Sequence, residues 1–205
     1  HRDWVLKDKR GKLVRAGLNS NWSGFFYALD FQNEGLKEHL RSVFKTIFTE
    51  WGFDFVKLDF LYAAALKPTH EKTQGQLMVE AMEFLREACG DKLILGSGVP
   101  LGPAFGLVDY CRVGSDVGLQ WEDNALRFAG YRERMSAQNS LLSVIGRRHL
   151  NGRAFVNDPD VFILRTSNQS MTQDQRMTLF RINLALGGVL LTSDDPAEYD
   201  ESELS

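Results

Sequence analysis

Cysteine, histidine and blocks of basic charge are all scarce in this chain of 205 residues. Two cysteines are too few for a disulfide framework. The four histidines are scattered without the spacing of metal ligands, so no metal site is expected. Lysine and arginine total 24 against 27 acidic residues, and the net charge is −3. Because no dense Lys/Arg block is present, nucleic acid and anionic membranes are not expected as partners.

Long apolar runs are also missing. No stretch approaches the roughly 20 residues that span a bilayer, so no membrane segment is expected. The chain begins with HRDWVLKD, without a methionine or a signal peptide, and it ends in DESELS soon after an apolar run. We therefore expect it to begin inside a domain, so the absence of a targeting segment says nothing about the full-length protein.

The chain does contain a regular alternation of helical and strand-like segments. Apolar spacing predicts four helices, at residues 33–51, 74–89, 124–139 and 172–186. A T-x-x-Q capping pattern, Thr172 with Gln175, opens the last of them. Short strand-like runs lie between the helices, at residues 53–59, 92–95, 109–116, 154–158 and 188–194. Such alternation is typical of βαβ units with a parallel sheet.

Two architectures fit such an α/β pattern: an open doubly wound sheet and a (β/α)8 TIM-type barrel. No glycine-rich phosphate loop follows any strand, which weakens the open nucleotide-binding sheet. Four strand-like runs end on an acidic residue, as expected where a barrel builds its active site: Asp59, Asp116, Asp158 and Asp194. A barrel needs eight strands and usually about 250 residues. The five runs therefore predict one partial barrel domain over residues 1–205, holding approximately strands 4 to 8 without the first strands.

The run at 53–59 ends in a lysine and an aspartate. Strand alternation places Lys57 and Asp59 on the same face. A lysine beside a partly buried carboxylate favours the ionised form, which a nucleophile requires. The same two residues also fit a structural ion pair, and the spacing leaves both interpretations open.

The run at 109–116 ends in a similar way. Alternation places Arg112, Gly114 and Asp116 on one face. Arg112 keeps its charge and has several donors for hydroxyl groups, and Gly114 leaves room for a ligand. A structural Arg–Asp pair is again the alternative. Two carboxylates across a barrel mouth suit glycoside hydrolysis, in which one attacks the anomeric carbon and the other protonates the leaving oxygen.

Three stretches of the chain have a familiar pattern: VKLDFLYAAAL, LGSGVPLGPAFGLVDYCRVGSDV and AFVNDPDVFILR. They resemble the corresponding parts of family 36 glycoside hydrolases, the melibiase-type α-galactosidases, and FYALDFQNEGLKEHL and GGVLLTSDD also look similar. The resemblance runs in order over nearly the whole chain. A K-x-D strand end followed by R-x-x-x-D is fairly specific for this clan when both occur in an α/β barrel.

The resemblance implies a role for each of the four residues singled out above. Asp59 takes the position of the nucleophile in a retaining reaction through a covalent glycosyl-enzyme. Asp116 takes the position of the acid/base. Lys57 and Arg112 match positions that hydrogen-bond sugar hydroxyls.

Further residues are candidates for the sugar site. Ser97 and Gly98 match a sugar-lining turn, in which Ser97 stands where the family is expected to have cysteine. Trp121 lies just beyond the 109–116 run and suits either stacking on an apolar sugar face or packing in a loop. Asn157 and Asp158 end the next strand, where we expect a supporting role.

The expected function is therefore hydrolysis of terminal α-galactosides in oligosaccharides, without metal or organic cofactor. The full-length protein is a candidate homo-oligomer. A D-D-G-W-like element, which by the resemblance grips the galactose from an early strand, is missing from the chain. The alternatives are a related α-N-acetylgalactosaminidase, a transglycosylase, and an inactive sugar-binding fragment.

Overall fold

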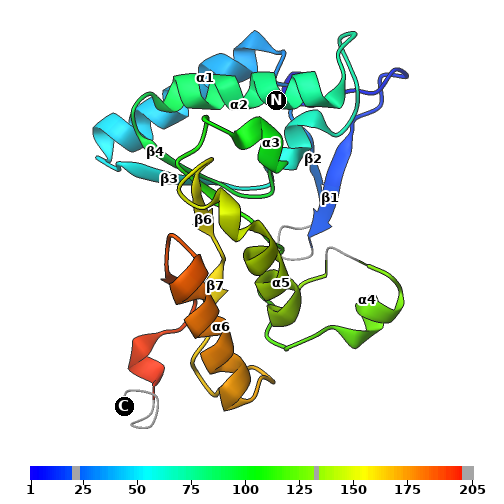
Figure 1. Ribbon diagram of the computed structural model, residues 1–205. Coiled ribbons are helices and arrows are strands. Elements are labelled where there is room, and N and C mark those ends of the chain that lie inside the picture. Colours follow the sequence, from blue (N-terminus) through cyan, green and yellow to red (C-terminus); the bar gives the residue numbers. More distant parts are fainter. Residues whose placement is uncertain (20–23, 132–133, 200–205) are drawn as a thin grey trace. The chain divides into compact units, whose positions relative to one another are not determined.

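The computed structural model describes residues 1–19, 24–131 and 134–199 (Figure 1). The chain forms two compact units, His1–Asp109 and Tyr110–Ser205. Among the described residues, no helix is both long and apolar enough to cross a membrane. That residues 1–205 form a single domain stays a prediction.

The first unit begins with a small antiparallel element that the sequence patterns did not predict. After a short 3-10 helix, Arg2–Trp4, strand β1 (Arg15–Asn19) pairs with β2 (Gly24–Tyr27). Next to them, the side chains of one small cluster are buried: Leu6, Val14 and Ala28. This cluster gives the N-terminal segment a core of its own.

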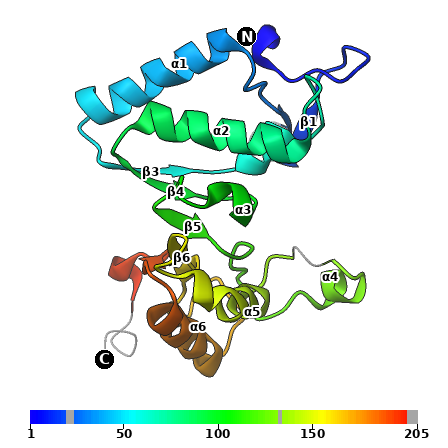
Figure 2. The same cartoon turned by 45° about the horizontal axis from the view of Figure 1, so that its top comes forward.

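Two parallel strands and two long helices follow in the first unit. They are α1 (Glu34–Lys45), β3 (Phe55–Leu58), α2 (Gln74–Cys89) and β4 (Leu93–Gly96), with the shorter helices Thr46–Glu50, Leu61–Ala65 and α3 (Leu101–Ala104) between or after them. Strands β3 and β4 are parallel, and α1 and α2 lie side by side next to them (Figure 2). Helix α2 has the predicted bounds, and the structure adds a capping box of Thr73 with Gln76 at its start and Gly90 at its end.

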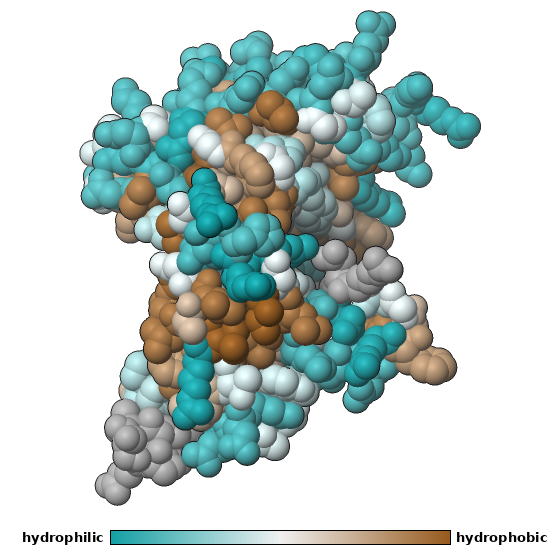
Figure 3. Space-filling model, viewed as in Figure 1, coloured by the Kyte–Doolittle hydropathy of each residue, from teal (hydrophilic) through white to brown (hydrophobic). Residues whose placement is uncertain are grey.

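The two faces of β3 differ in burial. Val56 and Leu58 are partly buried, whereas Phe55 and Lys57 are exposed. Phe55 stands opposite Leu93 of β4, which is exposed as well. The strand face that carries Lys57 is therefore open in the described structure. On the face drawn in Figure 3, apolar residues gather in a patch bordered by hydrophilic ones.

The second unit has two pairs of parallel strands. Its strands are β5 (Tyr110–Arg112), β6 (Val156–Asp158), β7 (Val161–Phe162) and β8 (Leu191–Thr192). Strand β5 pairs with β6, and β7 pairs with β8. The helices are α4 (Asn124–Phe128), α5 (Ala137–Arg147), α6 (Gln173–Leu186), Arg148–Leu150 and Pro196–Glu198. The capping box of Thr172 with Gln175 opens α6 as predicted.

Three predicted elements of this unit are wrong in extent. The helix predicted over 124–139 is two helices, because Gly130 with φ of 73° closes the turn after α4 and Ser136 caps a new start for α5. The strand predicted over 109–116 ends at Arg112, and the strand predicted over 188–194 covers only Leu191–Thr192. All five predicted strand regions do contain a strand, and the α/β class with parallel strands is confirmed. Closure into a barrel stays a prediction.

Candidate active site

Asp59 lies directly after the last residue of β3, on the exposed side of the strand. The backbone N–H of Phe60 donates to Oδ1 of Asp59 over 2.7 Å. Phe60 has φ of 55°, a left-handed conformation that is strained for a bulky residue. Such strain gathers at functional sites, where the surrounding structure holds it in place.

Ser97 and Gly98 hold the turn after β3 through their backbones. The Ser97 N–H donates to the Leu58 carbonyl over 2.8 Å, and the Ser97 carbonyl accepts from Leu61 over 3.3 Å. The Gly98 carbonyl accepts from the Tyr62 N–H over 2.7 Å. Only 3% of Ser97 is exposed. The predicted sugar-lining turn thus lies against the strand end that carries the candidate nucleophile.

Replacing Gly98 by alanine is expected to lower the activity of the full-length protein. Its φ is +63°, and an added Cβ would lie 3.3 Å from the backbone N and Cα of Phe60. The strained conformation costs Gly98→Ala about 1 kcal/mol of folding free energy, and the contact pushes on the residue that holds Asp59. Gly90→Ala is the matched control, because Gly90 has φ of +60° with open space around it. Thermal melting should show similar losses of stability, whereas kcat should fall only in Gly98→Ala. Equal kcat in the two variants would contradict the coupling.

Asp59 also borders a small apolar pocket. The pocket has a volume of about 230 Å³, and aromatic side chains form much of its wall: Phe26, Tyr27, Phe31 and Phe60. Apolar walls with a few placed polar groups are typical of ligand sites. Burial, with the charge of Asp59 added, raises the pKa of the neighbouring Tyr62. The carboxylate therefore lies where a ligand could meet both an apolar wall and a negative charge.

Lys57 shares the exposed face of β3 with the candidate nucleophile, in the predicted phase. Within the described ranges, no ion pair joins Lys57 to Asp59. The structural ion pair that the spacing left open is therefore not formed here. Binding of a sugar hydroxyl by Lys57 remains a prediction.

Arg112 is the centre of an ionic network in the second unit. Its Nε pairs with Oδ2 of Asp158 at 2.7 Å, its Nη1 with Oδ1 of Asp116 at 2.9 Å, and its Nη2 with Oδ1 of Asp160 at 2.7 Å. Burial opposes the charge of Arg112, but the three carboxylates outweigh it and raise the pKa of the guanidinium. Asp116 keeps 62% of its side chain exposed. The alternation argument placed Asp116 on a strand, whereas a turn brings it to Arg112.

The expectation that Gly114 leaves room for a ligand is wrong. A Cβ at Gly114 would lie 3.1 Å from Cβ of Ser143. Helix α5 carries Ser143 and occupies the space. The glycine therefore permits close packing of the helix against the turn that leads to Asp116.

Trp121 packs partly buried against the hydrophobic cluster of the second unit. Its carbonyl accepts from the Gln138 N–H over 2.9 Å. Next to it, Glu122 accepts from Nε and Nη2 of Arg134, both at 2.7 Å. These charged hydrogen bonds, working against burial, hold the pKa of Glu122 at about 2. These contacts agree with the interpretation that Trp121 packs in its loop. Stacking of Trp121 on a sugar remains a prediction.

The other two acidic strand ends are buried in structural contacts. Asp158 is fully buried and pairs with Arg112. Asp194 is buried, pairs with Arg165 and accepts from the Leu164 N–H over 2.6 Å. The next residue, Asp195, caps the helix Pro196–Glu198. Neither Asp158 nor Asp194 is open to a substrate as Asp116 is.

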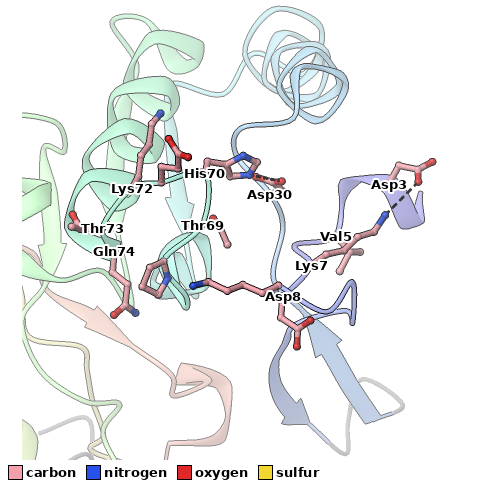
Figure 4. A pocket seen from close by; sticks show the side chains of 13 residues that line it. Asp3, Val5, Lys7, Asp8, Asp30, Thr69, His70, Lys72, Thr73 and Gln74 are labelled. Carbon is pink, nitrogen blue, oxygen red and sulfur yellow. Dashed lines mark hydrogen bonds and ion pairs between the residues drawn. The ribbon is translucent and has the colours of Figure 1, made fainter.

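A larger pocket of about 810 Å³ lies elsewhere in the first unit (Figure 4). Neither Lys57 nor Asp59 lines it. Two pairs of its charged side chains lie within the wall, His70 with Asp30 at 3.1 Å and Lys7 with Asp3 at 4.0 Å. The pocket is thus distinct from the candidate nucleophile.

Comparison with known proteins places this geometry in context. No family model matches the chain. The α-galactosidase of Thermus thermophilus, solved in complexes with stachyose and with p-nitrophenyl α-D-galactopyranoside, is 34% identical with a TM-score of 0.86. The match covers 99% of this chain but only 43% and 41% of those chains, so this chain spans less than half of their length.

More distant structures share the fold alone. α-Galactosidase I of Mortierella vinacea is 18% identical with a TM-score of 0.62, and the match covers 88% of this chain and 45% of that one. A family 27 β-L-arabinopyranosidase of Geobacillus stearothermophilus is 20% identical with a TM-score of 0.60, covering 91% and 44%. Over nearly its whole length, the chain therefore has the fold of one part of the α-galactosidases and related glycoside hydrolases.

Proposed function

We propose that the chain is the catalytic part of a retaining α-galactosidase of the family 36 type, with approximately strands 4 to 8 of a TIM-type barrel. One observation carries the proposal. Exposed carboxylates follow parallel strands, Asp59 after β3 and Asp116 beyond β5, in a chain 34% identical to an α-galactosidase with substrates bound. Glycoside hydrolysis requires two such groups.

The two carboxylates take different parts in the reaction. Asp59 attacks the anomeric carbon and forms a glycosyl-enzyme, while Asp116 gives its proton to the departing oxygen. Asp116 then takes a proton from water, which attacks the anomeric carbon and releases Asp59. The contact from Arg112 engages Oδ1 of Asp116 and leaves the exposed side of that carboxylate for the leaving group. No metal or organic cofactor takes part in this scheme.

The remaining candidates bind the substrate. Lys57 extends from the same open face as Asp59. Arg112 uses three of its five donors on carboxylates, which leaves two for sugar hydroxyls. The Ser97–Gly98 turn lines the sugar next to the strand end, and Trp121 offers an aromatic face near Asp116. The substrate is a terminal α-galactoside of an oligosaccharide.

The stereochemistry and sugar preference test the proposal. The full-length protein should hydrolyse p-nitrophenyl α-galactoside, and proton NMR of the first product should show α-galactose. Release of β-galactose would refute retention, since an inverting enzyme gives the opposite anomer. Preference for the α-N-acetylgalactosaminide, or transfer to an added sugar, would favour those alternatives. Binding without turnover would identify an inactive sugar-binding fragment.

A further inference from the structure

The turn after β6 has a constrained acidic residue that the roles above do not use. Asp160 follows Pro159 and has φ of 73°, a left-handed conformation that, apart from glycine, is adopted mainly by asparagine and aspartate. Its N–H donates to Oδ1 of Asp158 over 2.8 Å, and its carbonyl accepts from Nδ2 of Asn183 over 3.3 Å. Only 7% of Asp160 is exposed. Its backbone is therefore held on both sides.

The side chain of Asp160 makes two contacts with residues that adjoin Asp116, in the sequence or through an ion pair. Oδ2 accepts from the backbone N–H of Val117 over 2.7 Å, and Val117 is the residue directly after Asp116. Oδ1 pairs at 2.7 Å with Nη2 of Arg112, whose Nη1 pairs at 2.9 Å with Oδ1 of Asp116. One carboxylate thus fixes both the backbone beside Asp116 and the guanidinium that holds its side chain.

Burial makes this arrangement costly. A buried carboxylate loses hydration, which raises the pKa of Asp160 despite the opposing effects of Arg112 and of the backbone N–H groups. A buried ion pair is weak evidence for net stability, and in some proteins such pairs serve to fix geometry instead. The contacts of Asp160 therefore point to orientation as its main effect.

We propose that Asp160 is a positioning residue for Asp116. It holds the turn from Arg112 to Val117 so that the exposed side of the Asp116 carboxylate faces the leaving oxygen. The inference rests on the proposed acid/base role of Asp116. Small displacements of a catalytic group are costly, because proton transfer requires hydrogen-bond distance to the reacting atom.

Two variants of the full-length protein test the inference, Asp160→Asn and Asp160→Gly. Both residues accept positive φ, so the backbone conformation is retained. The substrates are melibiose, whose sugar leaving group needs a proton, and p-nitrophenyl α-galactoside, whose leaving group needs little help. We expect kcat/KM on melibiose, which reports departure of the leaving group, to fall about 10- to 100-fold. On the aryl substrate, kcat/KM should fall only slightly.

The controls separate this inference from the proposed function. Asp174→Asn makes the same charge change at an exposed position near the start of α6 and should leave both rates unaltered. Equal losses on both substrates, or failure of both Asp160 variants to fold by circular dichroism, would overturn the positioning role. If Asp116→Ala shows the leaving-group dependence and the Asp160 variants do not, only the positioning role fails. If Asp116→Ala lacks that dependence, the acid/base assignment fails and the positioning role fails with it.

Discussion

Replacing Asp59 by alanine is expected to abolish hydrolysis of all α-galactosides by the full-length protein, with kcat at least about 10⁴-fold lower. Without the carboxylate, no group attacks the anomeric carbon and no glycosyl-enzyme forms. A good leaving group should not restore the rate, because the missing step is the attack rather than the departure. Initial rates on melibiose and on p-nitrophenyl α-galactoside measure the effect.

A control for Asp59→Ala is available near the start of the same strand. Asp54 is an exposed carboxylate just before β3 that pairs with Lys92. Asp54→Ala removes a charge from the same segment and should leave kcat within a few-fold of the wild type, since surface ion pairs contribute little. Appreciable turnover by Asp59→Ala would disprove the nucleophile assignment.

Replacing Asp116 by alanine is expected to lower the rate strongly for substrates with a poor leaving group and weakly for those with a good one. Hydrolysis of melibiose should fall about 10²- to 10⁴-fold, the usual contribution of a general acid. The first step with p-nitrophenyl α-galactoside should be largely spared, because p-nitrophenolate departs without a proton. A burst of p-nitrophenol in rapid mixing would detect the trapped glycosyl-enzyme, since the second step still needs a base.

The ionic network around Arg112 should keep the fold intact in this variant, so that a loss of rate is not a loss of folding. In Asp116→Ala, Arg112 still has Asp158 and Asp160 as partners, so its charge stays compensated. The fold should therefore persist, as thermal melting can verify. Similar losses in the first step, measured as kcat/KM on melibiose and on the aryl substrate, would show that Asp116 does not protonate the leaving group.

Local signals explain which elements were predicted well. Helix α2 spans the predicted residues 74–89, because a capping box and a C-terminal glycine are encoded within a few residues. The division between α4 and α5 was missed, since the apolar spacing continued across a loop that Gly130 and Ser136 define. The β1–β2 pair was missed as well, because its strands are short and bury few side chains.

The sequence by itself determined the alternation of strands and helices and the position of Asp59 directly after a strand, because side-chain period and caps depend on near neighbours. Only the tertiary structure decided what surrounds the carboxylates of Asp59 and Asp116. Gly98 lies against Phe60, helix α5 packs against Gly114, and Asp160 contacts Arg112 and Val117. Each of these contacts joins segments that are remote in the sequence. Such contacts follow from burial and packing, which no local pattern of residues encodes.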